Sequence, residues 1–329
     1  MKKAISILLA AAMGAAALTG CSKSSGSSSS GNTPLVLNEV AHSIFYAPQY
    51  AAIELGYFED EGIDLTLVNG AGADKVMTAL ISGDAQIGFM GSEASIYVYQ
   101  EGSQDYAVNF AQLTQRAGNF LVGRQPEDNF KWESLKGKKV LGGRAGGMPQ
   151  MVFEYILKKH GMDPKTDLSI DQSINFGLTA AAFTSDDADY TVEFEPFATT
   201  LESEGSGYVV ASLGTESGYV PYTAYCARKS YVEQNPEIIQ KFTNAIQKGM
   251  DYVNSHSAEE IAKTIQPQFK ETPVDKLAVI VGRYKDQDTW KDDTVFEKES
   301  FELLENILEE ARVPYEDLVT TQFSEQAAK

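Results

Sequence analysis

The stretch 35–68 limits the possible folds most, because it reads as one complete strand–helix–strand unit. Leu35–Leu37 is a short apolar run that predicts a buried strand. The helix that follows has Pro48 near its first turn, and Gly56 stands where a helix end favours a left-handed residue. Ile63–Val68 alternates apolar and polar residues, which predicts a second strand. The fold class that this unit predicts is α/β.

The loop after the first strand is a candidate for one wall of a ligand site. In open α/β sheets, ligands bind in the crevice at the carboxyl ends of the parallel strands. His42, Phe45 and Tyr46 follow directly after the first strand. We therefore expect these three residues at the mouth of a site.

Residues 47–65 also carry a resemblance to a known family. They read A-P-x-Y-x-A-x-x-x-G-Y-F-x-x-x-G-I-x-L, and Gly56-Tyr57-Phe58 with Gly62-Ile63 is the most specific part. This segment resembles the opening of the solute-binding proteins of the nitrate/sulfonate/taurine and thiamine-pyrimidine group, which serve ABC importers. Two later segments agree: L-K-G-K-x-V at 135–140 and N-P-E-x-x-x-K-F-x-x-A-x-x-K-G at 235–249. The resemblance extends over nearly all of residues 35–312.

The resemblance implies a two-lobe fold of the periplasmic-binding-protein type (type II). Two crossing strands would connect the lobes, near 114–119 and 219–222. Lobe one would comprise residues 34–115 plus 225–329, and lobe two residues 116–224. A monomeric protein of this kind would close on a ligand held between its lobes and deliver it to a membrane permease driven by an ATPase.

The N-terminus predicts export and anchoring. A positively charged segment, Lys2-Lys3, precedes an uncharged apolar run over residues 4–17. Leu18-Thr19-Gly20-Cys21 follows this run directly. This resembles a bacterial lipoprotein signal, so we expect residues 1–20 to be removed and Cys21 to be lipidated on the outer face of the cell membrane. Residues 21–33 are rich in Ser and Gly and would form a flexible tether of about 20 Å.

Composition and motifs exclude several classes of function. Removal of residues 1–20 takes away two lysines, so the formal net charge falls from −19 to −21, which disfavours nucleic-acid binding. Cys226 is the sole cysteine after Cys21 and lies in an apolar run, where a buried thiol is expected. The three histidines do not cluster, and neither a metal-binding nor a catalytic motif is present. We therefore expect no metal, no cofactor and no enzymatic activity.

Two glycine-containing loops are further candidates for ligand contact. Residues 83–91, G-D-A-Q-I-G-F-M-G, resemble the family segment whose next loop touches the ligand, which implicates Ser92 and Glu93. The loop 143–149 precedes a helix, where backbone N–H groups and the helix dipole favour an acceptor or anion. Its candidate contacts are Arg144, Ala145 and Gly146, although sulfonate binders usually offer a hydroxyl-bearing residue here.

The segment 188–196 resembles the family's strand that ends in Glu-Pro, so Glu193 and Glu195 are expected to accept from amino or ring N–H groups. Glu195 is expected on a loop and not in the core. The remaining candidates for the cleft are Arg116, Asn175, Phe176, Tyr190 and Tyr222. Aromatic rings can hold a planar heterocycle between them, and a carboxylate can accept from its amino group. This mixture favours a nitrogen heterocycle such as a thiamine-precursor pyrimidine. An organic sulfonate, taurine or nitrate-type anion is the alternative, and a tethered extracellular enzyme is a third possibility.

Overall fold

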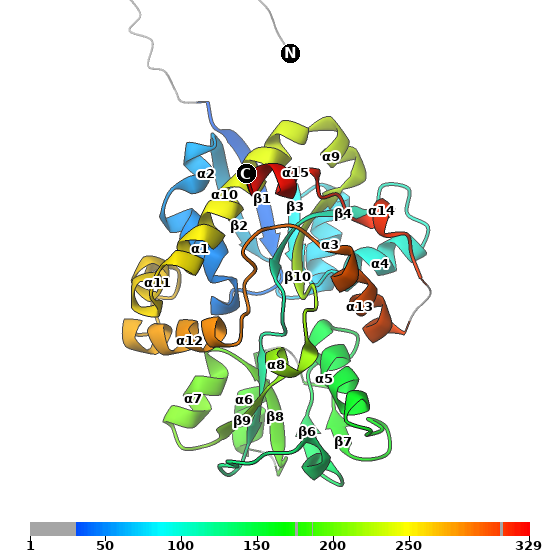
Figure 1. The fold of residues 1–329 in the computed structure, drawn as a ribbon, viewed down its shortest axis with the longest axis vertical. Coiled ribbons are helices and arrows are strands. Elements are labelled where there is room, and N and C mark those ends of the chain that lie inside the picture. The colour runs from blue at the N-terminus through cyan, green and yellow to red at the C-terminus, as the bar shows by residue number, and fades with distance from the viewer. Residues whose placement is uncertain (1–30, 175–176, 186, 310–311) are drawn as a thin grey trace, which may run out of the picture. The chain divides into compact units, whose positions relative to one another are not determined.

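The computed structural model describes residues 31–174, 177–185, 187–309 and 312–329. The predicted signal peptide, Cys21 and most of the tether lie outside these ranges. The described chain forms two five-stranded sheets with helices around them, labelled in Figure 1. Each sheet contains parallel strands and one strand antiparallel to its neighbours, which is β10 in the first sheet and β5 in the second. In each sheet this is the first strand that the chain forms after it arrives from the other sheet.

The first sheet is built from the N-terminal strands and one late strand. Its order is β2-β1-β3-β10-β4. β1 pairs in parallel with β2 and β3, whereas β10 is antiparallel to both β3 and β4. The strands are β1 (Thr33–Glu39), β2 (Ile63–Asn69), β3 (Ile87–Met90), β4 (Ala107–Thr114) and β10 (Thr223–Arg228).

The second sheet is built entirely from the middle of the chain, in the order β7-β6-β8-β5-β9. β6 pairs in parallel with β7 and β8, and β5 is antiparallel to β8 and β9. Its strands are β5 (Asn119–Gly123), β6 (Lys139–Leu141), β7 (Ser169–Asp171), β8 (Tyr190–Phe194) and β9 (Tyr208–Ser212).

Two segments connect the sheets, which confirms the prediction of two crossings. The chain leaves the first sheet after β4 and returns to it before β10. The two segments are hydrogen-bonded to each other, since Val220 N–H donates to the Gln115 carbonyl at 2.9 Å. Where they join the first sheet, Thr223 N–H of β10 donates to Thr114 Oγ1 of β4 at 3.0 Å. The crossings therefore form a paired connection rather than two independent linkers.

The first strand–helix–strand unit is confirmed. β1 and β2 are parallel in the register Leu35↔Leu65, and Gly56 has φ +74° between α1 and α2. The next helix, α3, begins at Ala73 and has Gly72 as its N-cap, with Asp74 in its first turn. The helices of the N-terminal half are η1 (Ile44–Tyr46), α1 (Ala47–Glu54), α2 (Tyr57–Asp60), α3 (Ala73–Ser82) and α4 (Glu93–Gln100).

The middle of the chain contains short helices around the second sheet. β7 ends at Asp171, before the candidate cleft residues Asn175 and Phe176. Asn175 and Phe176 themselves lie outside the described ranges. The helices here are η2 (Trp132–Leu135), α5 (Met148–Lys159), α6 (Thr179–Ser185), α7 (Phe197–Ser203) and α8 (Leu213–Ser217).

The C-terminal half is helical and returns to the first sheet, where Figure 1 shows α10 beside α1. A Cβ on Gly249 of α10 would lie 2.2 Å from the Pro48 carbonyl oxygen, so glycine is what allows the two helices to approach this closely. After α13 come two short helices that the sequence analysis did not predict. The elements are α9 (Lys229–Gln234), α10 (Pro236–Ser255), α11 (Ala258–Ile265), η3 (Gln266–Gln268), α12 (Val274–Asp286), α13 (Lys298–Leu308), α14 (Tyr315–Leu318) and α15 (Gln322–Ala327).

Cys226 lies inside β10 and is buried with a free thiol, as its apolar surroundings predicted. Burial raises the pKa of this thiol to about 12, so the residue is a packing group and not a nucleophile.

Candidate functional site

Four aromatic side chains from both sheets gather at one place, and we call them the aromatic cage: Phe45, Tyr46, Phe194 and Tyr222. The ring of Phe45 lies 5.3 Å from that of Tyr46, 5.6 Å from that of Tyr222 and 5.8 Å from that of Phe194. Phe194 and Tyr222 are 6.3 Å apart. All four are buried. Three of them were predicted, and Phe194 was not.

Local structure holds the cage in place. Phe45 and Tyr46 form η1, whose N-cap Ser43 accepts from the Phe45 N–H at 3.3 Å. Trp290 Nε1 donates to the Phe45 carbonyl at 2.8 Å. Gly118, in the first crossing, leaves room for the ring, because a Cβ there would lie 2.5 Å from two of its carbons. Phe45 is therefore fixed by segments that are far apart in sequence.

Glu93 places a buried carboxylate beside the cage. It is the first residue of α4, is 3% exposed, and its Oε2 has no hydrogen-bond partner. Burial raises the pKa of this carboxyl to about 7, and the backbone N–H groups of Glu93 and Met148 oppose the rise. Burial is the largest cause that raises the pKa values of Tyr46 and Tyr222; the charge of Glu93 raises both further, and that of Glu39 also raises the pKa of Tyr46. The hydrogen bond from Ser92 Oγ to the Pro221 carbonyl joins the residues directly before Glu93 and Tyr222, so the carboxylate and the Tyr222 phenol lie close to each other.

Two more polar groups are buried here without partners. The Tyr222 hydroxyl makes no hydrogen bond, and neither does the side-chain oxygen or nitrogen of Asn119. Asn119 lies directly opposite Phe194 in the β5–β8 pair, and directly opposed residues share a face of the sheet. Buried polar groups of this kind are rare in proteins and call for an explanation. The sequence analysis missed Asn119, whose signal was a carboxamide in the otherwise apolar strand Asn119–Gly123.

In the predicted anion-binding loop, 143–149, the candidate contact residues are exposed or already paired with other protein groups. Arg144, Ala145 and Gly146 are exposed, and the Arg144 side chain, 59% exposed, makes a 3.9 Å ion pair with Asp74. The Gly146 N–H already donates to Gln150 Oε1 at 2.8 Å. The contribution of this segment to the site is the buried Met148 at the start of α5, whose backbone N–H acts on the Glu93 carboxyl.

Three predicted residues of β8 and its end are bound to other protein groups. Glu193 accepts from the hydroxyls of Thr179 (3.0 Å) and Thr191 (2.6 Å). Burial raises the pKa of Glu193 to about 7, against the lowering effect of these hydrogen bonds. The Tyr190 hydroxyl donates to Glu127 at 2.7 Å.

Glu195 was expected on a loop outside the core, which is wrong, because its side chain is buried. It accepts from the Thr199 N–H at 2.9 Å and from Arg283 Nη1 at 2.8 Å. Both of its oxygens are thus used by the protein, and Arg283 reaches them from α12.

The remaining predicted residues lie around the first sheet and the crossings. His42 Nδ1 bonds Glu39 at 2.8 Å and its Nε2 bonds the Gln268 carbonyl at 3.0 Å. The hydrogen bond to Glu39 raises the pKa of His42. Ser92 Oγ donates to the Pro221 carbonyl. Arg116 Nη1 donates to the Gly214 carbonyl at 3.3 Å, whereas its buried Nε has no partner.

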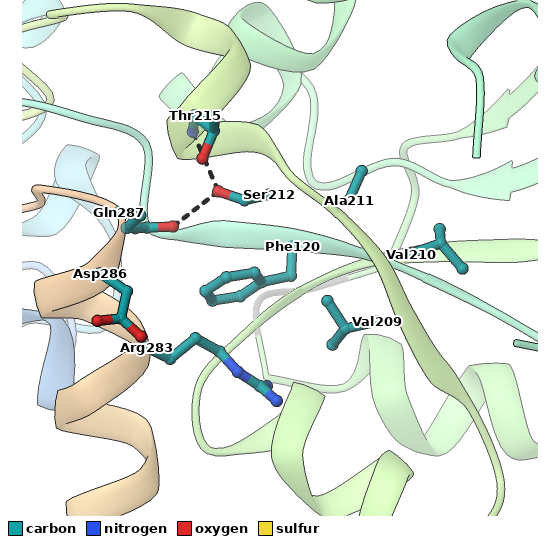
Figure 2. Close-up of a pocket in the computed structure, with 9 residues that line it drawn as sticks. All are labelled: Phe120, Val209, Val210, Ala211, Ser212, Thr215, Arg283, Asp286 and Gln287. Carbon is teal, nitrogen blue, oxygen red and sulfur yellow. Dashed lines mark hydrogen bonds between the residues drawn. The ribbon is translucent and has the colours of Figure 1, made fainter. Parts of the chain in front are cut away.

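A separate pocket of about 360 Å³ lies between β9 and the end of α12 and holds none of the predicted ligand residues (Figure 2). Its polar groups are largely engaged by the protein: Arg283 pairs with Glu195 and Glu202, and Gln287 accepts from Ser212 at 2.7 Å. We therefore place the candidate site at the aromatic cage. The pocket is lined by Phe120, Val209, Val210, Ala211, Ser212, Thr215, Arg283, Asp286 and Gln287.

Within the described ranges, no group of three or more His, Cys, Asp or Glu side chains could hold a metal ion. In the same part of the chain, every helix is too short or not apolar enough to cross a membrane.

Comparisons with known proteins place this geometry in a family. YtlA of Bacillus subtilis, named as a binding protein, is 43% identical over 89% of this chain and 90% of its own. A 4-amino-5-hydroxymethyl-2-methylpyrimidine phosphate synthase of Candida albicans is 23% identical over 67% of this chain and 66% of its own. The periplasmic aliphatic sulphonate binding protein SsuA of Escherichia coli superposes with a TM-score of 0.68 at 17% identity, covering 87% of this chain and 97% of that one. This likeness confirms the predicted periplasmic-binding-protein fold. Residues 44–260 match the NMT1/THI5-like family, and with the identity to YtlA this match shows that the chain belongs to it.

Proposed function

We propose that this protein is an extracytoplasmic solute-binding protein that captures a small nitrogen heterocycle and delivers it to an ABC importer. The observation that carries the proposal is the aromatic cage with a buried carboxylate at its side, Glu93, whose Oε2 has no hydrogen-bond partner. Rings bind the faces of a planar heterocycle, and the carboxylate, the Tyr222 hydroxyl and the Asn119 amide suit its polar edge. A thiamine-precursor pyrimidine is one ligand of this class.

The proposed capture mechanism is closure of two lobes, residues 34–115 plus 225–329 and residues 116–224, on a monomer. The cage supports it, because Phe45 and Tyr46 would come from the first lobe, Phe194 from the second, and Tyr222 from the second crossing at their boundary. The paired crossings at Gln115 and Val220 would act as the hinge. In this scheme Glu193 and Glu195 support the second sheet and do not receive the ligand.

We further propose that Cys21 carries lipid and that residues 21–33 tether the body to the outer face of the cell membrane. The support is the signal pattern that ends at Cys21 and the resemblance of the body to outward-facing binding proteins. The permease and its ATPase are the partners proposed on the same grounds.

An anion-binding protein is the second candidate. Arg116 favours it, because its buried Nε has no partner and could receive an oxyanion. The SsuA neighbour, named for aliphatic sulphonates, has the same fold. Against it, Glu93 would repel an anion in the cage, and Arg144 is paired on the surface.

The fungal relatives named as pyrimidine phosphate synthases make catalysis the third candidate. We propose binding without turnover. Incubation of the protein with the probes below, followed by mass analysis of the small molecules, is expected to return them unchanged. A new product formed in proportion to protein and time would establish an enzyme.

Native mass spectrometry of gently purified protein, followed by calorimetric titration, tests the ligand class. We expect a co-purified heterocycle, or stoichiometric binding of 4-aminopyrimidine or 4-amino-5-hydroxymethyl-2-methylpyrimidine, and weak or absent binding of propanesulfonate. Preference for propanesulfonate would replace this proposal with the anion-binding one.

A further inference from the structure

Glu93 is an acid without a basic partner. Among the ion pairs of the described residues none includes it, and its Oε2 makes no hydrogen bond. The titratable groups that act on the site are the phenols of Tyr46, on η1, and Tyr222, on the second crossing, and the carboxylate of Glu39 at the end of β1, whose charge acts on Tyr46. Burial raises the pKa of both phenols, so they stay uncharged at neutral pH. The contribution of α5 is the backbone N–H of Met148, which carries no titratable proton.

We propose that Glu93 selects a weak nitrogen base by sharing one proton with it, so that ligand capture is coupled to pH. This rests on the proposed function, which it deepens by naming the charge class of the ligand. In the complex one proton lies between Glu93 Oε2 and a ring nitrogen or amidine group. A neutral base meets the carboxylic acid, or a protonated base meets the carboxylate, and both routes give the same complex.

Other charge classes fit this site less well. An anion would be repelled by the carboxylate, and none of the ion pairs among the described residues supplies Glu93 with a cation. A quaternary ammonium would satisfy the cage but has no N–H for Oε2, the Tyr222 hydroxyl or the Asn119 carbonyl. A planar base with both donors and acceptors on its edge can satisfy all three buried groups.

Gly91 positions the carboxylate. A Cβ at residue 91 would lie 2.1 Å from Glu93 Oε2 and 2.6 Å from Oε1. These atoms are the end of a flexible side chain, so an added methyl group would displace the carboxylate and leave the backbone in place. Gly91→Ala therefore tests whether the position of the carboxylate matters, whereas Glu93→Gln tests whether its acidic group matters.

Proton sharing has a definite sign. The carboxylic acid form of Glu93 predominates below its pKa of about 7. In this pH range Glu93 itself supplies the proton that it shares with a neutral base. Above this pH, binding must take up a proton from solvent, so affinity falls. For a base that is uncharged throughout, we expect roughly tenfold weaker binding at about pH 8 than at about pH 6. A permanent cation shows the opposite slope, because it prefers the carboxylate.

The experiment is calorimetric titration of the whole mature protein with 4-aminopyrimidine, N-methylpyridinium and propanesulfonate at both pH values. Glu93→Gln is expected to bind 4-aminopyrimidine roughly 10- to 100-fold more weakly at the lower pH and to lose the pH slope. Gly91→Ala should weaken binding with a normal circular dichroism spectrum. The matched controls are Glu101→Gln, an exposed acid at the other end of α4, and Gly282→Ala in α12, where a Cβ meets only ordinary contact.

The outcomes separate the two proposals. If 4-aminopyrimidine binds equally well at both pH values, or Glu93→Gln keeps the slope, proton sharing is refuted while the proposed function stands. Tighter binding of N-methylpyridinium that increases with pH would mean a cage for permanent cations. Binding of propanesulfonate alone, or of no probe, would count against both proposals.

Discussion

Gly118 shows how much of the site depends on one residue. The Phe45 ring occupies the space that a side chain at residue 118 would fill, because a Cβ there would lie 2.5 Å from the ring. We expect Gly118→Ala to lower the free energy of unfolding by about 1–3 kcal/mol, the usual cost of overpacking, and to weaken ligand binding by shifting Phe45. Urea denaturation measures the first effect. Gly282→Ala is the control, and an unchanged midpoint for Gly118→Ala would show that the ring has room to move.

The buried carboxyl groups of Glu93 and Glu193 make the stability of the fold depend on pH. Burial raises the pKa values of Glu93 and Glu193 from 4.5 to about 7. Between these values the folded state holds more protons than the unfolded state, so the stabilising contribution is complete below pH 4.5 and is lost as pH rises to about 7. Each group can account for up to about 3 kcal/mol.

The measurement is the thermal midpoint of the ligand-free protein from acid to neutral pH. We expect it to fall over this range, and to fall less in Glu93→Gln and Glu193→Gln, because an amide does not titrate. A midpoint that rises toward neutral pH in the wild-type protein, with the same slope in both variants, would contradict this assignment.

At the scale of single elements, α11 offers a clean test of local sequence signals. Ser257 Oγ accepts from the Glu260 N–H at 3.3 Å, and Glu260 Oε2 accepts from the Ser257 N–H at 2.9 Å, which is a capping box. We expect Ser257→Ala to cost about 1 kcal/mol of stability in urea unfolding. Ser203→Ala serves as control, because that exposed hydroxyl only donates to the Thr200 carbonyl. Equal effects of the two substitutions would argue against a specific cap.

At the scale of the whole molecule, the tether predicts where the protein is found. Cys21→Ala should release the protein from the membrane fraction of an expressing bacterium, since lipid on Cys21 is the proposed anchor. Ligand binding by the released protein should be unchanged, because the site lies in the body. Immunoblots of membrane and soluble fractions measure the effect. A Cys21→Ala protein that stays membrane-bound through the same extraction would require a different attachment.

Local signals in the sequence determined most of the elements and the fold class. The pattern at 63–68, the turn at Gly56 and the cap at Ser257 each depend on neighbouring residues, so they were predictable without knowing the fold. The position of Glu93 after a buried strand was also visible, because strand ends meet at one edge of a parallel sheet. The predicted set therefore included the acid and three of the four cage rings.

Only the tertiary structure decided which charged residues face the cage. Glu195 finds Arg283, 88 residues away, and Arg144 finds Asp74 on α3. Glu193 meets Thr179, whereas Glu93, of the same residue type, has no partner for Oε2. Asn119 comes beside Phe194 through the register of antiparallel strands that are far apart in sequence. Such pairings depend on packing between distant segments, and a side chain that looks available in the sequence is often already bound in the fold.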